Sequence, residues 1–262
     1  MTSQIRSAAV LLVLVLAPVF VAGSQQSLPG QAAAKPGLPP DTPLHQLRPD
    51  YTIPYGAPTE AGIVEILNRV HGYLDASTPA RLVNRKTGEA VADLGRIDEQ
   101  TAFERGAFPL ISYEWGVTYS AMLLAGEVTG DRRFTDYTAR RMRFIADLAP
   151  VYRNLAKSNP RAAGPLRSVL NPQALDDAGS MCAAMVKTLR AGVQADLRPL
   201  VDNYVEYISK GQLRLSDGTL ARSRPQPSTL WLDDLYMSVP ALAQAGKLTA
   251  ETRYYDDAAR QV

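Results

Sequence analysis

Residues 121–145, AMLLAGEVTGDRRFTDYTARRMRFI, contain a pattern that returns twice further along the chain. Residues 184–208, AMVKTLRAGVQADLRPLVDNYVEYI, align with them without a gap, and so do residues 241–262, ALAQAGKLTAETRYYDDAARQV. Each copy ends one helix, turns at a short polar stretch such as TGD or TAE, and begins a second helix. Hairpins that recur in this way are the signature of a repeat architecture.

The two helices of each hairpin differ in polarity. In the second helix of the first copy, Phe134, Tyr137, Met142 and Ile145 alternate with arginines, whereas the first helices are apolar on nearly all sides. A helix that is apolar all round is buried, and an amphipathic helix lies outside it. No convincing strand alternation is present, so the sequence predicts an all-α fold of stacked hairpins, either a solenoid or a closed α/α toroid.

A pair of acidic residues recurs at the start of the inner helices, in SYEWG, NPQALDDAGSM and LWLDDLYM. The aligned positions form two sets, with Tyr113, Asp176 and Asp233 in one and Glu114, Asp177 and Asp234 in the other. In a toroid, the starts of the inner helices surround one mouth of the central cavity. Helix macrodipoles favour carboxylates there, and several acids around one cleft are what acid–base catalysis needs.

Two alternative roles for these aspartates stay open. Acids in a first helical turn can cap a helix without any further function, and one of the two sets can serve that purpose alone. DDLYM also resembles the aspartate-rich boxes that hold magnesium diphosphate in all-α terpene synthases, but such a box needs a third acid about three residues on. Met237 stands at that place. The recurrence in register, with Trp115 and Trp231 nearby, favours a functional cleft.

The sequence lacks the residues that a metal site or a nucleotide-binding site needs. His45 and His71 form no HxxxH pattern and Cys182 has no cysteine partner, so we expect no metal site, and Cys182 is predicted to be a core residue. No GxGxxG or P-loop is present, and we expect no cofactor. Arg222 and Arg224 precede the second aspartate pair and can clamp an anionic group of a substrate, although solvated arginines are the commoner case.

The composition limits the kinds of partner. The 262 residues are 46% hydrophobic and 21% charged, which suffices for a substantial core, and the formal net charge is only +2. No long basic run is present, so neither nucleic acid nor an anionic membrane surface is expected as a partner. A neutral or singly charged small ligand fits this composition better, and we expect a monomer.

The first fifty residues are predicted to lie outside the folded domain. Residues 1–23 combine Arg6, an apolar core and small residues at the end, which is typical of a cleaved secretory signal, a retained anchor being the alternative. Residues 24–50 are rich in Pro, Gln and Ala, which predicts an extended tether. We therefore expect a secreted or periplasmic protein that does not contact the membrane after cleavage, with order beginning near residue 51.

Three segments carry a resemblance to a known family: SYEWGVTYSAMLLAGEVTGD, ALDDAGSMCAAM and TLWLDDLYMSVPALAQAGKLT. With them, residues 51–262 resemble the unsaturated rhamnogalacturonyl hydrolases of glycoside hydrolase family 105. The resemblance implies an (α/α)6 toroid and a catalytic domain over residues 51–262. It also implies the substrate, a pectin-derived oligosaccharide whose non-reducing end is a 4,5-unsaturated uronic acid.

The resemblance further implies roles for single residues. Asp233, the aspartate of the WxD-type motif, donates a proton to the C4=C5 double bond, water adds at C5, and the hemiketal collapses to release the neighbouring sugar. Asp176 is its partner, and Asp177 and Asp234 are the alternates. The expected substrate contacts are Tyr113, Trp115, Trp231, Arg222 and Arg224, with Trp231 stacked on the unsaturated ring.

Two features depart from the family pattern. The segment ARSRPQPS lacks the histidine that family members can carry shortly before the WxD helix. The chain also stops at RYYDDAARQV, in the middle of a helix by its own repeat, so we expect an incomplete toroid that is truncated at its C-terminus. The second hypothesis is therefore a non-catalytic, open toroid that binds a glycan or a protein partner.

Overall fold

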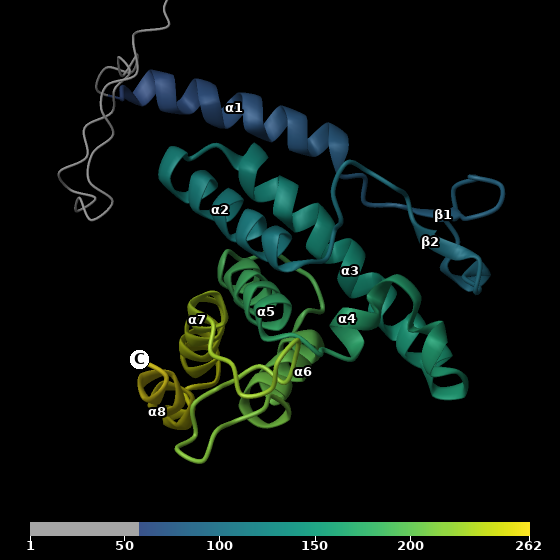
Figure 1. Cartoon of the computed structure of the whole chain (residues 1–262). Coiled ribbons are helices and arrows are strands. Elements are labelled where there is room, and N and C mark those ends of the chain that lie inside the picture. Colours follow the sequence, from purple (N-terminus) through teal and green to yellow (C-terminus); the bar gives the residue numbers. More distant parts are fainter. Residues whose placement is uncertain (1–57) are drawn as a thin grey trace, which may run out of the picture. The chain divides into compact units, whose positions relative to one another are not determined.

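The structure, a computed structural model, describes residues 58–262, which form a mostly helical unit (Figure 1). The predicted signal and tether, residues 1–50, lie outside the described residues. The elements in chain order are α1 (Glu60–Ser77), β1 (Leu82–Asn84), the 3₁₀ helix η2 (Leu94–Arg96), β2 (Thr101–Phe103), α2 (Tyr113–Thr129), α3 (Arg132–Ser158), the 3₁₀ helix η3 (Pro160–Leu166), α4 (Arg167–Leu170), α5 (Leu175–Arg190), α6 (Arg198–Glu206), the π-helix η4 (Tyr207–Gly211), α7 (Leu232–Thr249) and α8 (Thr252–Arg260).

Three helical hairpins follow one another, and the prediction of an all-α fold is confirmed. α2 packs against α3, α5 against α6, and α7 against α8. The first helices also pack against one another, α2 against α5 and α5 against α7 (Figure 1). Within residues 58–262 this row of hairpins is open, and the N-terminal ends of α2, α5 and α7 carry the aligned acidic residues.

The burial of the first helices depends on their neighbours. Most residues of α5, which lies between α2 and α7, are buried. They include Cys182, a free cysteine whose thiol pKa is raised to about 12 by burial, so it is a core residue as predicted. α2 and α7 each pack against one other first helix among those described, and apolar side chains such as Val128 and Leu232 are exposed on them. The prediction that the first helices are buried all round therefore holds for α5 only.

Two glycines at equivalent repeat positions allow the first helices to approach closely. A Cβ on Gly116 of α2 would lie 2.5 Å from the backbone carbon of Ser180 in α5. A Cβ on Gly179 of α5 would lie 2.5 Å from the carbonyl oxygen of Met237 in α7. Packed backbones cannot give way as the end of a flexible side chain can, so a larger residue would push the helices apart. The third copy has Tyr236 at this position, and its side chain is exposed.

α3 is amphipathic as predicted, but one of its arginines is buried. Arg141 is 3% exposed, and its guanidinium donates to the carbonyl and the hydroxyl oxygen of Thr78 at 2.7 and 2.8 Å. The same group pairs with Asp75 of α1 at 3.2 Å and lies over the ring of Tyr137. Arg141 therefore joins the C-terminal end of α1 to α3.

Two short strands contradict the expectation that the chain contains none. β1 and β2 form an antiparallel pair in which Leu82 lies opposite Phe103. Each strand has three residues, and a two-residue alternation needs about four to eight residues to be recognised.

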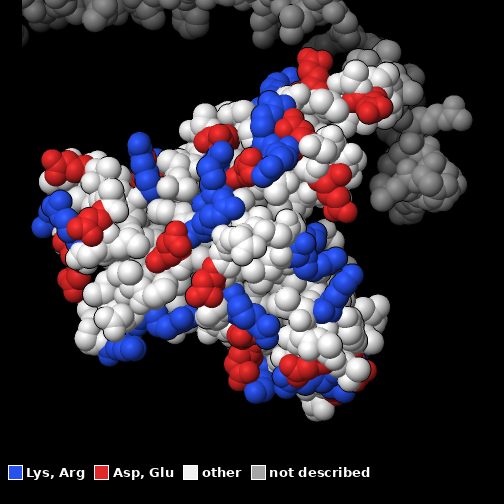
Figure 2. Space-filling model, turned by 180° about the vertical axis from the view of Figure 1, so that it is seen from behind, with Lys and Arg blue, Asp and Glu red and all other residues white. Residues whose placement is uncertain are grey.

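The surface of the described residues carries interspersed charges. On the face seen from behind, acidic and basic side chains lie next to one another (Figure 2). Exposed ion pairs within residues 58–262 include Arg140 with Asp75 and Arg198 with Asp202. Among residues 58–262, no helix combines the length and the apolar character that a membrane crossing requires.

Candidate active site

A cleft of about 530 Å³ lies at the N-terminal ends of α2 and α5. Its lining includes Tyr113 at the start of α2, Asp176 and Asp177 at the start of α5, and Arg222 and Arg224 from the segment that precedes α7. The repeats explain the location, because equivalent first turns of neighbouring helices end at the same side of the stack. The cleft therefore combines carboxylates from one helix with guanidinium groups from a loop.

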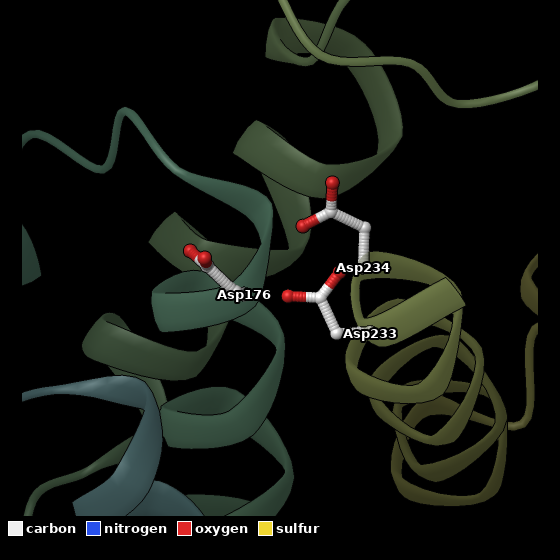
Figure 3. A group of neighbouring side chains, drawn as sticks. All are labelled: Asp176, Asp233 and Asp234. Carbon is white, nitrogen blue, oxygen red and sulfur yellow. The ribbon is translucent and has the colours of Figure 1, made fainter. Parts of the chain in front are cut away.

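Three carboxylates converge beside this cleft, from two different helices (Figure 3). One oxygen each of Asp176, Asp233 and Asp234 lies within 4.8 Å of the others. Asp176 comes from the first turn of α5, and Asp233 and Asp234 come from the first turn of α7. The structure thus brings the predicted pair Asp176 and Asp233 together, and it adds Asp234 from the other aligned set.

Arg222 binds all three carboxylates with one guanidinium. Its Nη2 donates to Asp176 Oδ2 at 2.8 Å and to Asp233 Oδ2 at 3.3 Å. Its Nε and Nη2 donate to the two oxygens of Asp234 at 2.5 and 2.9 Å, a bidentate pair. The guanidinium also lies 4.0 Å from the ring centroid of Trp231. Arg222 is therefore an internal clamp on the carboxylates, whereas the sequence suggested a clamp on an anionic substrate.

Asp234 differs from the other two acids of the cluster in its burial. Its side chain is 8% exposed, whereas the side chains of Asp176 and Asp233 are 17% and 46% exposed. Burial raises the pKa of Asp234, Arg222 acts against this rise, and the carboxylates of Asp176 and Asp233 add to it. Asp234 in turn raises the pKa of Arg222, so the guanidinium stays charged. Asp234 thus anchors Arg222, and Asp176 and Asp233 are the more accessible acids.

Asp177 points to a different partner. Its carboxylate accepts the backbone N–H of Tyr113, the first residue of α2, at 2.7 Å. Burial raises the pKa of Asp177, and the negative charge of Asp176 adds to this rise. Asp177 therefore satisfies a free N–H at the start of the neighbouring helix, whereas within α5 it is Asp176 Oδ1 that accepts an N–H of the first turn, that of Asp177, at 2.7 Å.

The predicted aromatic contacts divide between the cleft and the core. Tyr113 is exposed and lines the cleft, and its pKa is raised mainly by Glu114 and further by Asp176 and Asp233. Trp115 is buried, stacks on Phe108 with ring centroids 4.7 Å apart, and donates its Nε1–H to the Tyr137 hydroxyl at 3.3 Å. Its position inside the packed interior does not support the predicted contact with substrate.

Arg224 and Trp231 are the two remaining predicted substrate contacts. Arg224 lines the cleft, and its guanidinium donates to the carbonyl oxygen of Gln173 at 3.4 Å. Among the described residues no carboxylate pairs with it, in contrast to Arg222. Trp231 is half-exposed, and one face of its ring is covered by the guanidinium of Arg222. A sugar ring can therefore stack only on its other face.

Two residues of the site were missed in the sequence. Gln212 lines the cleft, accepts the hydroxyl of Tyr207 at 2.6 Å, and donates to the carbonyl of Ala221. It therefore holds the backbone next to Arg222, a contact across a loop for which the sequence has no local signal. Gly179 brings α5 close to α7 and so brings Asp176 close to Asp233. The alignment of Gly179 with Gly116 in the repeats could have revealed this close packing.

The three carboxylates could serve as the ligands of a cation, but the guanidinium of Arg222 already occupies the place of that cation. A divalent cation between Asp176, Asp233 and Asp234 would have to displace a guanidinium that contacts all three. Because Asp234 is bound in a bidentate pair, the residues fit an internal ion pair better than a metal centre. The arrangement can hold a proton near one accessible carboxyl and accept one at another.

The comparisons with known proteins give a family for the chain. No curated protein matches it. One solved structure that matches is a possible member of GH105 family from Salmonella enterica subsp. enterica serovar Paratyphi A, 14% identical over 86% of this chain, with a TM-score of 0.44. The chain spans about half of that structure, 51%, and the likeness is too distant to support an argument.

A family model gives the firmer result. Glycosyl Hydrolase Family 88 matches residues 81–262, which include the whole carboxylate cluster and its clamp. The resemblance in the sequence was to family 105, and both are families of glycoside hydrolases, so the predicted class is confirmed. The chain belongs to glycosyl hydrolase family 88.

Proposed function

We propose that the chain hydrolyses oligosaccharides whose non-reducing end is a 4,5-unsaturated uronic acid, as found on lyase-cleaved rhamnogalacturonan. The observation that carries this proposal is the convergence of Asp176 and Asp233, from the first helices of successive hairpins, beside a cleft that also presents arginine side chains. A uronate carries one carboxylate, which suits a cleft with a guanidinium such as that of Arg224 on its wall. The family supports the general reaction class, and the choice of substrate rests on the resemblance of the motifs.

The proposed reaction starts with a proton transfer. Asp233, the more exposed acid, gives its proton to C4 of the double bond, and positive charge develops at C5 and the ring oxygen. Water adds at C5 while Asp176 accepts its proton, so one water is consumed. The hemiketal at C5 opens, and the resulting hemiacetal at C1 releases the neighbouring sugar as an alcohol. This differs from the displacement at C1 that ordinary glycosidases use.

The clamp supports a division of labour between the acids. Arg222 is tied to Asp234 through two hydrogen bonds, and its remaining contacts reach Asp176 at 2.8 Å and Asp233 at 3.3 Å. The closer contact fixes the position of the Asp176 carboxylate, and the longer contact leaves the half-exposed Asp233 freer to reach a bound sugar.

The test is an Asp233→Asn variant assayed on lyase-digested rhamnogalacturonan, following the loss of ultraviolet absorbance of the unsaturated uronyl group. We expect the rate to fall by about 10²–10⁴-fold, the range for removal of a general acid. Asp256→Asn, which changes an exposed acid of α8, is the matched control and should keep full activity.

The second hypothesis, a protein that binds a glycan without turnover, predicts a different result. The unmodified protein would then bind the digested oligosaccharide in calorimetry without any loss of absorbance. Full activity of Asp233→Asn would show that Asp233 is not the proton donor, although the protein would still be an enzyme.

We further propose secretion or a periplasmic location, which rests on the signal-like residues 1–23 alone.

A further inference from the structure

A second cavity, of about 320 Å³, lies apart from the aspartate cluster, and its lining shares no residue with the cleft. Its walls come from the segment after β1, the turn before β2, the C-terminal part of α3 and the start of η3. Arg85, Asp98, Tyr152, Arg161 and Gly164 are among its lining residues. The segments that form it are far apart in the sequence, so the cavity is a product of the fold.

The wall of this cavity contains a buried hydroxyl that has no partner. Tyr152 is 1% exposed, and within residues 58–262 its hydroxyl makes no hydrogen bond. Buried polar groups are almost always paired, because an unpaired one carries its full desolvation penalty. Gly164, with a φ of +52°, lies so close that a Cβ on it would be 2.8 Å from the Tyr152 ring. The tyrosine is therefore held in place by packing.

Tyr152 shares the lining of the cavity with charged residues. Burial raises the pKa of Tyr152 to about 12, and the charges that act on it further are the cation of Arg85, which lowers it, and the anion of Asp98, which raises it. Both residues line the same cavity. An unpaired donor and a guanidinium group thus belong to the same cavity.

The acids of the cavity already have donors, whereas its cations lack acceptors. Asp98 accepts the N–H of Gln100 and the hydroxyl of Thr101, both at 2.9 Å. Glu99 accepts the side-chain amide of Asn159 at 3.3 Å. Arg85 and Arg161 are exposed to solvent, and in the described part of the chain their guanidinium groups have no ion pair or hydrogen bond with the protein. The two acids and the two arginines balance in charge, but the donors without a protein acceptor are the two guanidinium groups and the Tyr152 hydroxyl.

We propose that this cavity binds a small oxyanion, the carboxylate of a uronic acid, which accepts hydrogen bonds from the Tyr152 hydroxyl and from Arg85 and Arg161. Two guanidinium groups and a hydroxyl are donors that match the lone pairs of a carboxylate. The volume suits a monosaccharide-sized ligand. The site shares no residue with the aspartate cleft, and the choice of a uronate as its ligand rests on the proposed function.

The experiment measures binding of galacturonate to the full chain by calorimetry, with galactose as the neutral analogue and inorganic phosphate as a second oxyanion. Galacturonate should bind and galactose should not. Tyr152→Phe keeps the packed ring and removes only the hydroxyl, so it should weaken galacturonate binding by about 10- to 100-fold. Arg224→Gln, which alters only the first cleft, should keep this binding, and that separates the two sites. Tyr152→Phe should also keep the hydrolase activity.

Thermal unfolding of Tyr152→Phe without ligand provides the second readout. A hydroxyl without a partner stabilises nothing, so the variant should melt at the same temperature as the unmodified protein or above it. A lower melting temperature would show that the hydroxyl is paired, for example with a bound water, and would overturn the proposal. Equal galacturonate affinity in the two proteins, or no binding of any probe, would also overturn it. Phosphate binding that depends on Tyr152, without galacturonate binding, would keep the oxyanion site and exclude the uronate.

Discussion

α5 and α7 are equivalent helices of two consecutive repeats, and both begin with a pair of aspartates, yet the pairs have different partners. In α5, Asp177 accepts a backbone N–H from α2. In α7, the equivalent Asp234 is held by the guanidinium of Arg222 in a bidentate pair. The first aspartates, Asp176 and Asp233, meet beside the cleft.

The difference follows from what each helix has beside it. α5 lies next to the N-terminal end of α2, where an N–H lacks a helical partner, so Asp177 supplies an acceptor. α7 follows the loop that carries Arg222, so Asp234 meets a cation. Equivalent positions in the repeats therefore occupy equivalent positions in their hairpins, but the partner that each carboxylate binds depends on the neighbouring segments.

Among the substitutions that test this comparison, Gly179→Ala should cause the largest loss of stability, because it should separate α5 from α7. The added Cβ would meet backbone atoms of Met237 at 2.5 Å, and overpacking of this kind costs about 3 kcal/mol of unfolding free energy. Because the first turns would move apart, hydrolase activity should fall too. Denaturant unfolding and the absorbance assay measure the two effects.

The matched control for this substitution is Gly72→Ala in α1, where no atom lies within 4 Å of the new Cβ. Alanine favours a helix over glycine by about 1 kcal/mol, so this variant should be as stable as the original protein or more stable. An equal loss of stability in both variants would show that close packing of α5 on α7 is not the reason.

A smaller effect is expected from Asp234→Asn. An amide cannot accept both bonds from Arg222, and its NH₂ group faces another donor, so the variant should lose about 1.5 kcal/mol of unfolding free energy at neutral pH. Asp202→Asn, which removes the exposed ion pair with Arg198, should show no measurable change. If Asp234→Asn is as stable as the original protein, Asp234 does not anchor the clamp.

The smallest effect is expected from Asp177→Asn, because the amide oxygen can still accept the N–H of Tyr113. Burial raises the pKa of Asp177 above its ordinary value of 3.8, so the folded protein holds this proton more tightly than the unfolded chain. The stability of the original protein should therefore decrease as the pH rises from this value through the raised pKa.

The variant lacks this titration, so its stability relative to the original protein should improve as the pH rises over the same window. Unfolding curves recorded from about pH 4 to pH 7 test this. A relative stability that worsens with rising pH would mean that Asp177 is stabilised as an anion.

Much of the architecture was visible in the repeats. The alignment of residues 121–145 with residues 184–208 and 241–262 predicted the hairpins, and the alternation around Phe134 predicted which helix is amphipathic. β1 and β2 were missed because three residues are too few to show alternation. The burial of Arg141 was missed because its partners, Thr78 and Asp75, come from a different part of the chain.

The candidate site was predictable to a similar extent. Matching repeat positions placed Asp176 and Asp233 on one side of the stack, since equivalent turns of stacked hairpins must face the same way. The partners of Asp177, Asp234 and Trp115 could not be predicted in this way, because each depends on a group distant in sequence that only packing brings near.

Periodicity within the chain thus established the helices, their order and the side on which the acids gather, because repeating local patterns produce repeating local geometry. The tertiary structure decided which groups become partners. Arg222 contacts three carboxylates, and Asp177 accepts an N–H of α2. Within residues 58–262, the hydroxyl of Tyr152 has no partner. A hydrogen bond needs two atoms within about 3 Å, and no pattern in the amino-acid sequence specifies that distance between residues far apart in the chain.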